Sequence, residues 1–123
     1  MRGGDLHRWM VQGLKSEAGR RGFWTRSEAY VGCGFADLII GKGNRFIVVE
    51  VECTPARLAR DLSKARSIHA TDLWIVVPDS TKRHRYRRRF PSNSESGMRV
   101  LVLSYPQTVK ALTEIGGYLD RDE

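Results

Sequence analysis

The chain has 123 residues, enough for one domain with a substantial core but too few for two independent ones. A hydrophobic content of 41% and a charged content of 28% are typical of a globular protein and argue against disorder. The net charge of +7 indicates a polyanionic partner, nucleic acid first and an anionic membrane surface second, because clustered Lys and Arg release counterions from such partners.

The cysteines and the apolar segments indicate where in the cell the protein is expected. The two cysteines, Cys33 and Cys53, lack CxxC spacing and nearby histidines, which argues against a disulfide framework and a zinc site. No apolar run approaches the roughly 20 residues of a membrane span, and residues 1–13 lack the apolar core of a signal peptide. We therefore expect one domain, residues 1–123, that is soluble, cytoplasmic and not bound to a membrane.

The N-terminal residues predict a helix that carries one acid along its apolar stripe. Asp5 suits the N-cap position, and the helix should end near Arg20. The stripe comprises Leu6, Trp9, Met10, Gly13 and Leu14. Glu17 continues it, so its carboxylate either lies at the rim of the core, the commoner case, or points into a site.

Three strands are predicted next. Residues 23–26 form a short strand before a looser segment over residues 27–34. Residues 35–40 and 45–52 form two more strands, joined by GKGN at 41–44, whose glycines and asparagine supply the conformations that tight turns need.

This hairpin gathers three acids. With residues 41–44 as the loop, Asp37 lies opposite Val48, and period-two alternation then places Asp37, Glu50 and Glu52 on one face. The other face carries Leu38, Ile40, Ile47, Val49 and Val51. Because both faces are largely apolar apart from the acids, we expect helices to cover both.

A second helix follows the hairpin. Thr54 and Pro55 suit its N-cap and first position, and it should run to about Ala70. The predicted inward residues are Leu58, Leu62, Ala65 and His69. The predicted outward residues are Arg57, Arg60, Asp61, Lys64 and Arg66.

Two strands and a helix complete the predicted architecture. Residues 73–77 are an apolar run typical of a buried strand, residues 98–105 predict another strand, and residues 106–115 predict a helix that ends at Gly116-Gly117. A strand, a helix and a buried strand in succession indicate a parallel crossover. The expected fold is therefore α/β, with a central mixed β-sheet flanked by helices.

A basic run separates the last two strands. Residues 82–89, KRHRYRRR, hold six Lys or Arg residues, and subtracting six from the net charge of +7 leaves +1 for everything else. Such a run is usually a solvated surface, but the near-neutral remainder favours phosphate binding here. The predicted nucleic-acid contacts are Arg20, Arg21, Arg26, Lys82, Arg83, Arg85, Arg87, Arg88 and Arg89.

The acids of the hairpin suit a hard divalent cation. Mg²⁺ takes a few carboxylates together with water and phosphate oxygens, so Asp37 and Glu50 are predicted ligands and the Val51 carbonyl a further oxygen. A cation held there would activate water for phosphodiester hydrolysis. The structural alternative is that Asp37 caps a strand end while Glu50 and Glu52 pair with arginines of the following helix.

The chain carries, in this order, Glu17, Gly22-Phe23, Arg26-Ser27, Ala36-Asp37 and Glu50-Val51-Glu52. This ordered set resembles the PD-(D/E)XK nuclease superfamily, in which an acid precedes a strand carrying Glu-x-Lys. Within the superfamily it is most similar to the archaeal-type Holliday junction resolvases, which have an acid on the first helix, a GF...RS segment and then the acid motif. The resemblance covers about residues 6–78.

The resemblance implies a restriction-endonuclease-like α/β sandwich with Mg²⁺ or Mn²⁺ as the cofactor. Asp37 and Glu50 would ligate the ion, Glu17 would contact it through water, and Ser27 would lie in the catalytic loop.

Position 52 departs from the superfamily pattern, because it is Glu where Lys is usual. Glu52 would then bind a second metal or act as a general base. Lys64 on the following helix is the alternative replacement for the lysine. We favour Glu52, since Lys64 is predicted to face outward.

The function implied is that of an endonuclease that resolves four-way DNA junctions as a homodimer, since two symmetric nicks require two active sites. Two other hypotheses stay open. One is a PD-(D/E)XK nuclease of restriction, repair or mobile-element processing, and the other is a DNA-binding relative that has lost catalysis.

Overall fold

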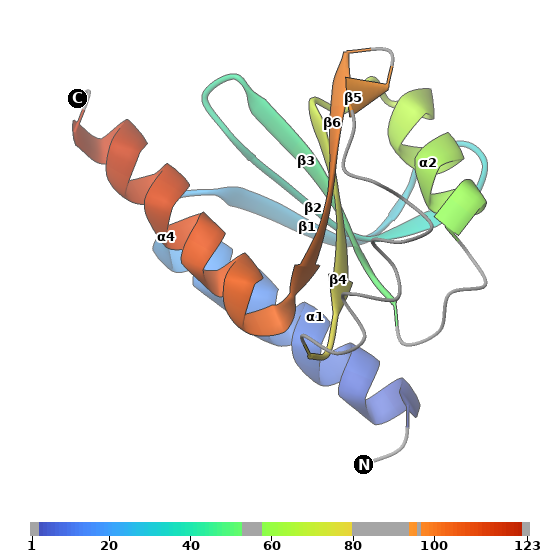
Figure 1. Ribbon diagram of the computed structural model, residues 1–123, viewed down its shortest axis with the longest axis horizontal. Helices are drawn as coiled ribbons and strands as arrows, with labels where there is room; N and C mark the ends of the chain where they lie inside the picture. Colours follow the sequence, from blue (N-terminus) through green and yellow to red (C-terminus); the bar gives the residue numbers. More distant parts are fainter. Residues whose placement is uncertain (1–2, 53–57, 80–93, 96, 122–123) are drawn as a thin grey trace.

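The computed structural model describes residues 3–52, 58–79, 94–95 and 97–121 (Figure 1). The helices in these ranges are α1 (Gly3–Arg20), α2 (Leu58–Ser67) and α4 (Tyr105–Arg121). The strands are β1 (Trp24–Tyr30), β2 (Phe35–Lys42), β3 (Arg45–Val51), β4 (Asp72–Val77), β5 (Ser94–Glu95) and β6 (Met98–Ser104). The helix start predicted at Thr54-Pro55 and the basic run at 82–89 lie outside the described residues. None of the described helices is long and apolar enough to cross a membrane.

The described strands form one six-stranded mixed sheet in the order β1-β2-β3-β4-β6-β5. Neighbours among β1, β2 and β3 run antiparallel, whereas β3, β4 and β6 run parallel, and β5 pairs antiparallel with β6. The parallel pairing of β3 with β4 around α2 confirms the predicted crossover. The predicted α/β architecture, a mixed sheet flanked by helices, is also confirmed.

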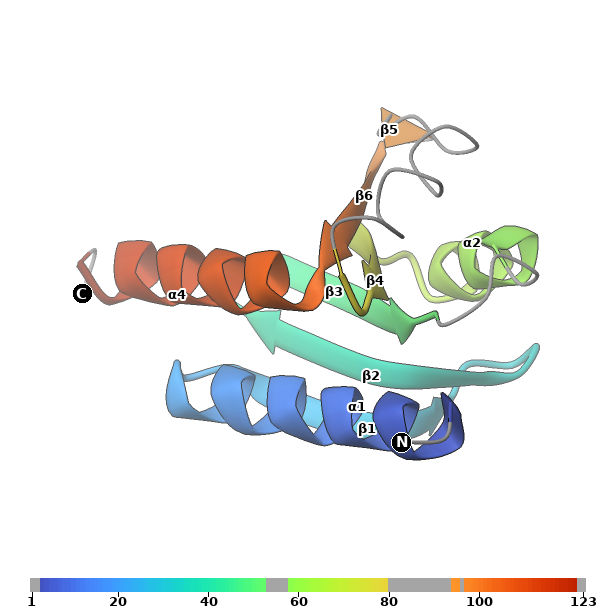
Figure 2. The same cartoon turned by 60° about the horizontal axis from the view of Figure 1, so that its bottom comes forward.

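Helices cover the sheet on both faces, and each face has its own apolar core. Figure 2 shows α1 and α4 side by side on one face and α2 on the other. The first core joins α1, α4 and inward residues of the sheet such as Leu38, Val49 and Trp74. The second includes Ile39, Val48 and Ile75 and packs against α2. The two-sided burial explains why the hairpin strands are apolar at nearly every position.

The register of the β2–β3 hairpin differs from the prediction by two positions. Leu38 pairs with Val49 and Lys42 with Arg45, so the turn is the two-residue Gly43-Asn44 and not residues 41–44. One step further along this register, Asp37 lies opposite Glu50, not opposite Val48. A shift of two preserves the alternation of faces, so the predicted apolar face of the hairpin is correct.

Several element boundaries also differ from the predictions. β1 continues to Tyr30, so residues 27–30 are not the looser segment predicted; Ser27, Ala29 and Tyr30 pair with Leu38, Ala36 and Phe35 of β2. α4 continues past Gly116 to Arg121. Gly116 is buried against Arg21, and a Cβ added to it would lie only 3.0 Å from Arg21 Cβ. The glycine thus permits close packing instead of ending the helix.

The buried faces of α1 and α2 are rotated from the predicted stripes. On α1, Trp9 is 55% exposed, and the buried apolar residues are Met10, Val11, Leu14 and Ala18. On α2, Asp61 and Lys64 are buried, although both were predicted to face outward. His69, predicted to be in the core, is exposed and has a positive φ of 54° just after the helix.

Candidate functional site

Two adjacent antiparallel strands bring the predicted acids together. Asp37 lies near the start of β2, and Glu50 lies near the end of β3. The Asp37 N–H donates to Glu50 Oε1 (2.9 Å), and the Val51 N–H donates to Asp37 Oδ2 (2.8 Å). Each carboxylate is therefore fixed by a backbone donor near the other acid. Glu52 follows directly after β3, where its N–H donates to the Val76 carbonyl of the neighbouring strand (2.9 Å).

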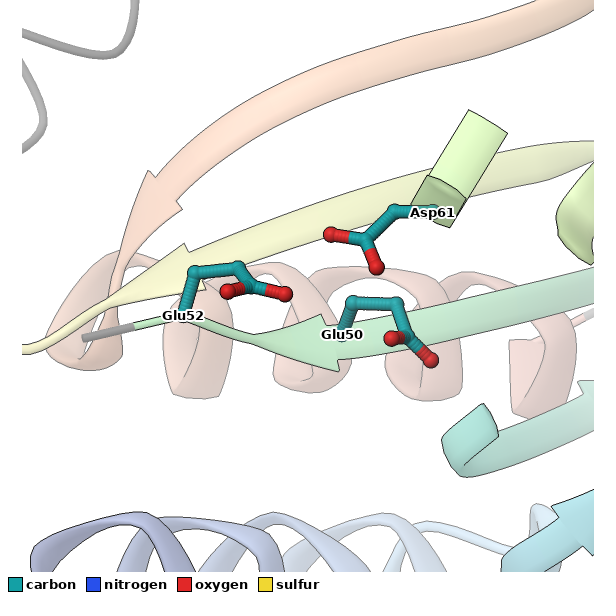
Figure 3. Close-up of side chains that lie close together, drawn as sticks. All are labelled: Glu50, Glu52 and Asp61. Atoms are coloured by element: carbon teal, nitrogen blue, oxygen red, sulfur yellow. The ribbon is translucent and has the colours of Figure 1, made fainter. Parts of the chain in front are cut away.

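Helix α2 presents two charged side chains to these acids. Lys64 Nζ lies 3.3 Å from Glu50 Oε2, and only 9% of its side chain and 2% of that of Glu50 are exposed. Asp61, one turn earlier, is fully buried, and one of its oxygens lies within 4.8 Å of a carboxylate oxygen of Glu50 and of Glu52. Figure 3 shows the three carboxylates gathered between β3 and α2. The prediction that Asp61 and Lys64 lie on the solvent side of this helix was wrong.

The N-terminal half of α1 closes another side of the site. His7 Nε2 lies 3.0 Å from Asp37 Oδ2, so His7, not Glu17, is the α1 residue that contacts a predicted metal ligand. Ser27 accepts a hydrogen bond from Lys15 Nζ (3.1 Å) and lines a smaller cavity next to His7 and Asp37.

The site is a cavity of about 970 Å³ between β2, β3, α1 and α2. Its lining includes four of the residues discussed above as site residues, namely Asp37, Glu50, Val51 and Glu52. Lys64, Arg60, His7 and Glu28 also line it. The walls of the cavity are therefore strongly charged. Such a group of carboxylates is costly to bury unless positive charges or a cation lie beside it.

Glu28 has an unusual backbone conformation beside this cavity. Its φ is 49° in the middle of β1, a left-handed conformation that a non-glycine residue seldom adopts. The ladder between β1 and β2 is interrupted there: Ser27 pairs with Leu38 and Ala29 pairs with Ala36, but Glu28, which lies between them, has no pairing partner on β2. Glu28 therefore interrupts the ladder at a position where it lines the same two cavities as Asp37.

Burial and mutual repulsion control the protonation of the acids. Burial first, and then the charge of Asp37, raises the pKa of Glu50 above its ordinary value. For Asp61, burial and the nearby carboxyl groups of Glu52 and Glu50 raise the pKa to about 11. At neutral pH the Asp61 carboxyl therefore retains its proton unless a cation replaces it.

Some of the predicted site residues lie elsewhere. Glu17 forms ion pairs with Arg20 and Arg21, and it lines neither cavity. The guanidinium of Arg20 lowers its pKa, and Arg21 contributes in the same direction. Because Glu17 is ten residues beyond His7 on one helix, about 15 Å separates them along its axis. Arg26 is exposed on the edge strand β1.

Two sequence signals pointed to the missed residues. His7 is spaced three and seven residues from Met10 and Leu14, so it continues the stripe that is buried in the structure. Asp61 and Lys64 are three residues apart and hence share one helix face, the face that also carries Ala65. Charge at these positions predicts solvent exposure, whereas in the structure both side chains are buried at a polar site.

The described donors fit a hard divalent cation. Asp37, Glu50, Glu52 and Asp61 offer carboxylate oxygens, which Mg²⁺, Mn²⁺ and Ca²⁺ prefer. Cys33 also lines the cavity, but it is exposed, its sulfur lies 4.0 Å from Ser67 Oγ, and the cluster of close metal-binding groups among the described residues consists of carboxylates alone. The chemistry of the site therefore favours an oxygen-seeking ion over zinc.

Comparison with known proteins identifies a similar fold but supplies no activity. No family model matches the sequence, and no curated protein matches it. Among solved structures, the crystal structure of AF1548, a protein of unknown function, is similar with a TM-score of 0.53 and 14% sequence identity. The match covers 88% of this chain but only 66% of that chain, so this chain spans slightly less than two thirds of its neighbour's length. At this identity the likeness concerns the fold alone.

Proposed function

We propose that the protein is a metal-dependent DNA endonuclease with a restriction-endonuclease-like sandwich. The observation that carries this proposal is the convergence of Asp37, Glu50, Glu52 and Lys64 on one cavity. Two acids on neighbouring strands, a third acid two residues later and a buried lysine supply the groups that the PD-(D/E)XK resemblance requires, with the lysine coming from α2 instead of from β3.

The order of the elements supports the same assignment. A helix, three antiparallel strands, a helix and a parallel strand bring the ends of β2 and β3 together under α2. This order provides a mixed sheet with helices on both faces, which is compatible with the sandwich that the resemblance implies.

The residues of the chain would divide the work of phosphodiester hydrolysis. Asp37 and Glu50 would hold Mg²⁺ or Mn²⁺, and the bound ion would lower the pKa of a water molecule and offset charge on the phosphate. The ammonium group of Lys64 lies where it could stabilise negative charge on a phosphate oxygen or orient the attacking water. His7 would hold the Asp37 carboxylate in place, since it contacts Oδ2 from α1.

Four-way DNA junctions are the proposed substrate and a homodimer the proposed assembly, because two symmetric cuts need two sites. The net charge of +7 favours binding to phosphate backbones, which fix position without reading sequence. The basic run at 82–89 is the main proposed contact.

The test is cleavage of a synthetic four-way junction in Mg²⁺, compared with linear duplex of the same sequence. We expect Asp37→Ala and Glu50→Ala to abolish cleavage and leave junction binding mostly intact. Glu114→Ala, an exposed acid on α4, is the matched control and should cleave normally. Near-normal cleavage by either site variant would contradict the metal assignment, and equal cleavage of both substrates would favour another DNA-processing nuclease.

A DNA-binding protein without catalysis is the second candidate, favoured by Glu52 at the usual lysine position. In that case the parent protein binds junctions but does not cut them in Mg²⁺ or Mn²⁺. Replacing several arginines of residues 82–89 separates binding from chemistry: a weaker salt dependence of binding is expected, because each lost phosphate contact removes counterion release. If the salt dependence of binding is unchanged, residues 82–89 do not contact phosphates and form an ordinary solvated surface.

A further inference from the structure

Asp61 is a buried acid that the proposed chemistry does not use. It is 0% exposed, and no amide, hydroxyl or basic group of the described residues donates to either carboxylate oxygen, so its polar neighbours are the carboxyl groups of Glu52 and Glu50. An unpaired polar group in a protein interior is costly and is seldom kept without a purpose. In Figure 3 its carboxylate points toward the side chains of Glu52 and Glu50. The direction of this buried side chain therefore indicates a ligand that binds carboxylates.

The spacing of the three acids suits one divalent cation. One oxygen from each of Glu50, Glu52 and Asp61 can be chosen so that all three lie within 4.8 Å of one another. Two ligands on opposite sides of an ion are separated by twice the bond length, about 4.2 Å for Mg²⁺ and roughly 4.6–5.2 Å for Ca²⁺. Separations no greater than 4.8 Å are therefore compatible with three oxygens around one divalent ion.

Lys64 and Asp37, two other charged residues of the cavity, already have partners. Lys64 contacts Glu50 Oε2, the oxygen that does not accept the Asp37 N–H. The Asp37 carboxylate contacts His7 and accepts the Val51 N–H. One ammonium group thus faces Glu50, whereas Glu52 and Asp61 have no basic partner in the described part of the chain within ion-pair distance.

We propose that Glu50, Glu52 and Asp61 form a second site for a hard divalent cation, separate from the one at Asp37 and sharing Glu50 with it. Glu50 lies on β3, Glu52 follows directly after β3 and Asp61 lies in the first turn of α2, so a bound ion would fasten this turn of α2 to the end of β3. The inference shares Glu50 with the proposed function but rests on the orphaned carboxylate of Asp61, and it requires no cleavage activity.

Titration with Mn²⁺, followed by the electron paramagnetic resonance signal of the free ion, counts the sites. The parent protein should bind two ions, and Asp61→Asn should bind one. Asp37→Asn should also bind one, at the site that retains Asp61. The control Glu114→Gln, which removes an exposed acid on α4, should bind two. Asp61→Asn with the stoichiometry and affinity of the parent would overturn the proposal.

Thermal unfolding supplies a readout of the same site without DNA. At a Mn²⁺ concentration about 100 times the Kd, the midpoint should rise by roughly 10 °C over that in EDTA, because the ion binds only the folded chain. Asp61→Asn should fold in EDTA, since it replaces an unpaired acid by a neutral group, and should lose at least half of the Mn²⁺-induced rise. Glu52→Gln carries the same expectation, and a full rise in both variants would contradict it.

The two proposals fail in different ways. If the protein does not cut junctions yet Asp61→Asn loses one Mn²⁺ ion, the endonuclease assignment falls and the second site stands. If junction cleavage depends on Asp37 but Mn²⁺ binding is insensitive to Asp61, the second site falls alone.

Discussion

Replacing Lys64 by methionine should expose how strongly the buried acids depend on one positive charge. The substitution keeps the length of the side chain but removes the ammonium group 3.3 Å from Glu50 Oε2. Glu50 then has three carboxylates in its surroundings, those of Asp37, Glu52 and Asp61, and no basic side chain of the described residues remains within ion-pair distance of it. Because it is 2% exposed, water cannot replace the lost partner.

The expected cost depends on pH. Leaving a buried charge without its partner typically costs about 3–5 kcal/mol, which is the loss we expect in EDTA near pH 9. Burial and the charge of Asp37 raise the pKa of Glu50, so at lower pH this carboxyl takes up a proton and loses its need for a partner. The destabilisation should therefore become smaller near pH 5.

Urea unfolding of a double-mutant cycle measures this coupling. The variants are Lys64→Met, Glu50→Gln and their combination, with Lys110→Met on the exposed face of α4 as the matched control. Glu50→Gln should remove most of the penalty of Lys64→Met, and the control should change stability by less than about 0.5 kcal/mol. A coupling energy near zero at alkaline pH would refute the view that Lys64 neutralises the site.

Three further predictions concern stability. Glu28→Gly should raise the free energy of unfolding by about 1 kcal/mol, because glycine accepts the positive φ of 49° without strain, and a lower thermal midpoint would contradict this. In EDTA, Asp61 keeps its proton in the folded chain from its ordinary pKa of 3.8 up to about 11, so the folded state binds more protons and stability should fall as pH rises through that window. Asp61→Asn should flatten this slope, which reaches at most about 1.4 kcal/mol per pH unit for one proton. Arg45→Ala should cost about 3–5 kcal/mol, since it leaves Asp72, 2% exposed, without its two-pronged partner; urea unfolding that shows less than about 1 kcal/mol would mean that Thr71 and water suffice.

Local patterns were enough to predict much of the sheet. The Gly43-Asn44 turn and the apolar runs on both sides specify β2 and β3, and the unbroken apolar run at 73–77 specifies β4, because a strand buried on both faces shows no alternation. Asp37 and Glu50 could be placed on one face despite a register error, since an error of two residues preserves the alternation of faces.

Helix faces were harder to predict. On α1, Trp9 fits an apolar stripe by hydrophobicity, yet it is exposed beside Tyr105, with the ring centroids 5.2 Å apart. On α2, Arg60, Asp61 and Lys64 suggested a solvated surface. The face of a helix that is buried depends on the sheet beneath it, and here part of that surface is a cluster of acids.

The sequence by itself determined the α/β fold class, the hairpin and the common face of Asp37 and Glu50, because all of these arise from alternation and turn chemistry over a few neighbouring residues. Only the tertiary structure decided that Lys64, Asp61 and His7 enter the site and that Glu17 does not. These side chains come from α1 and α2, and their positions relative to β3 depend on how each helix packs across the sheet, which no local periodicity encodes.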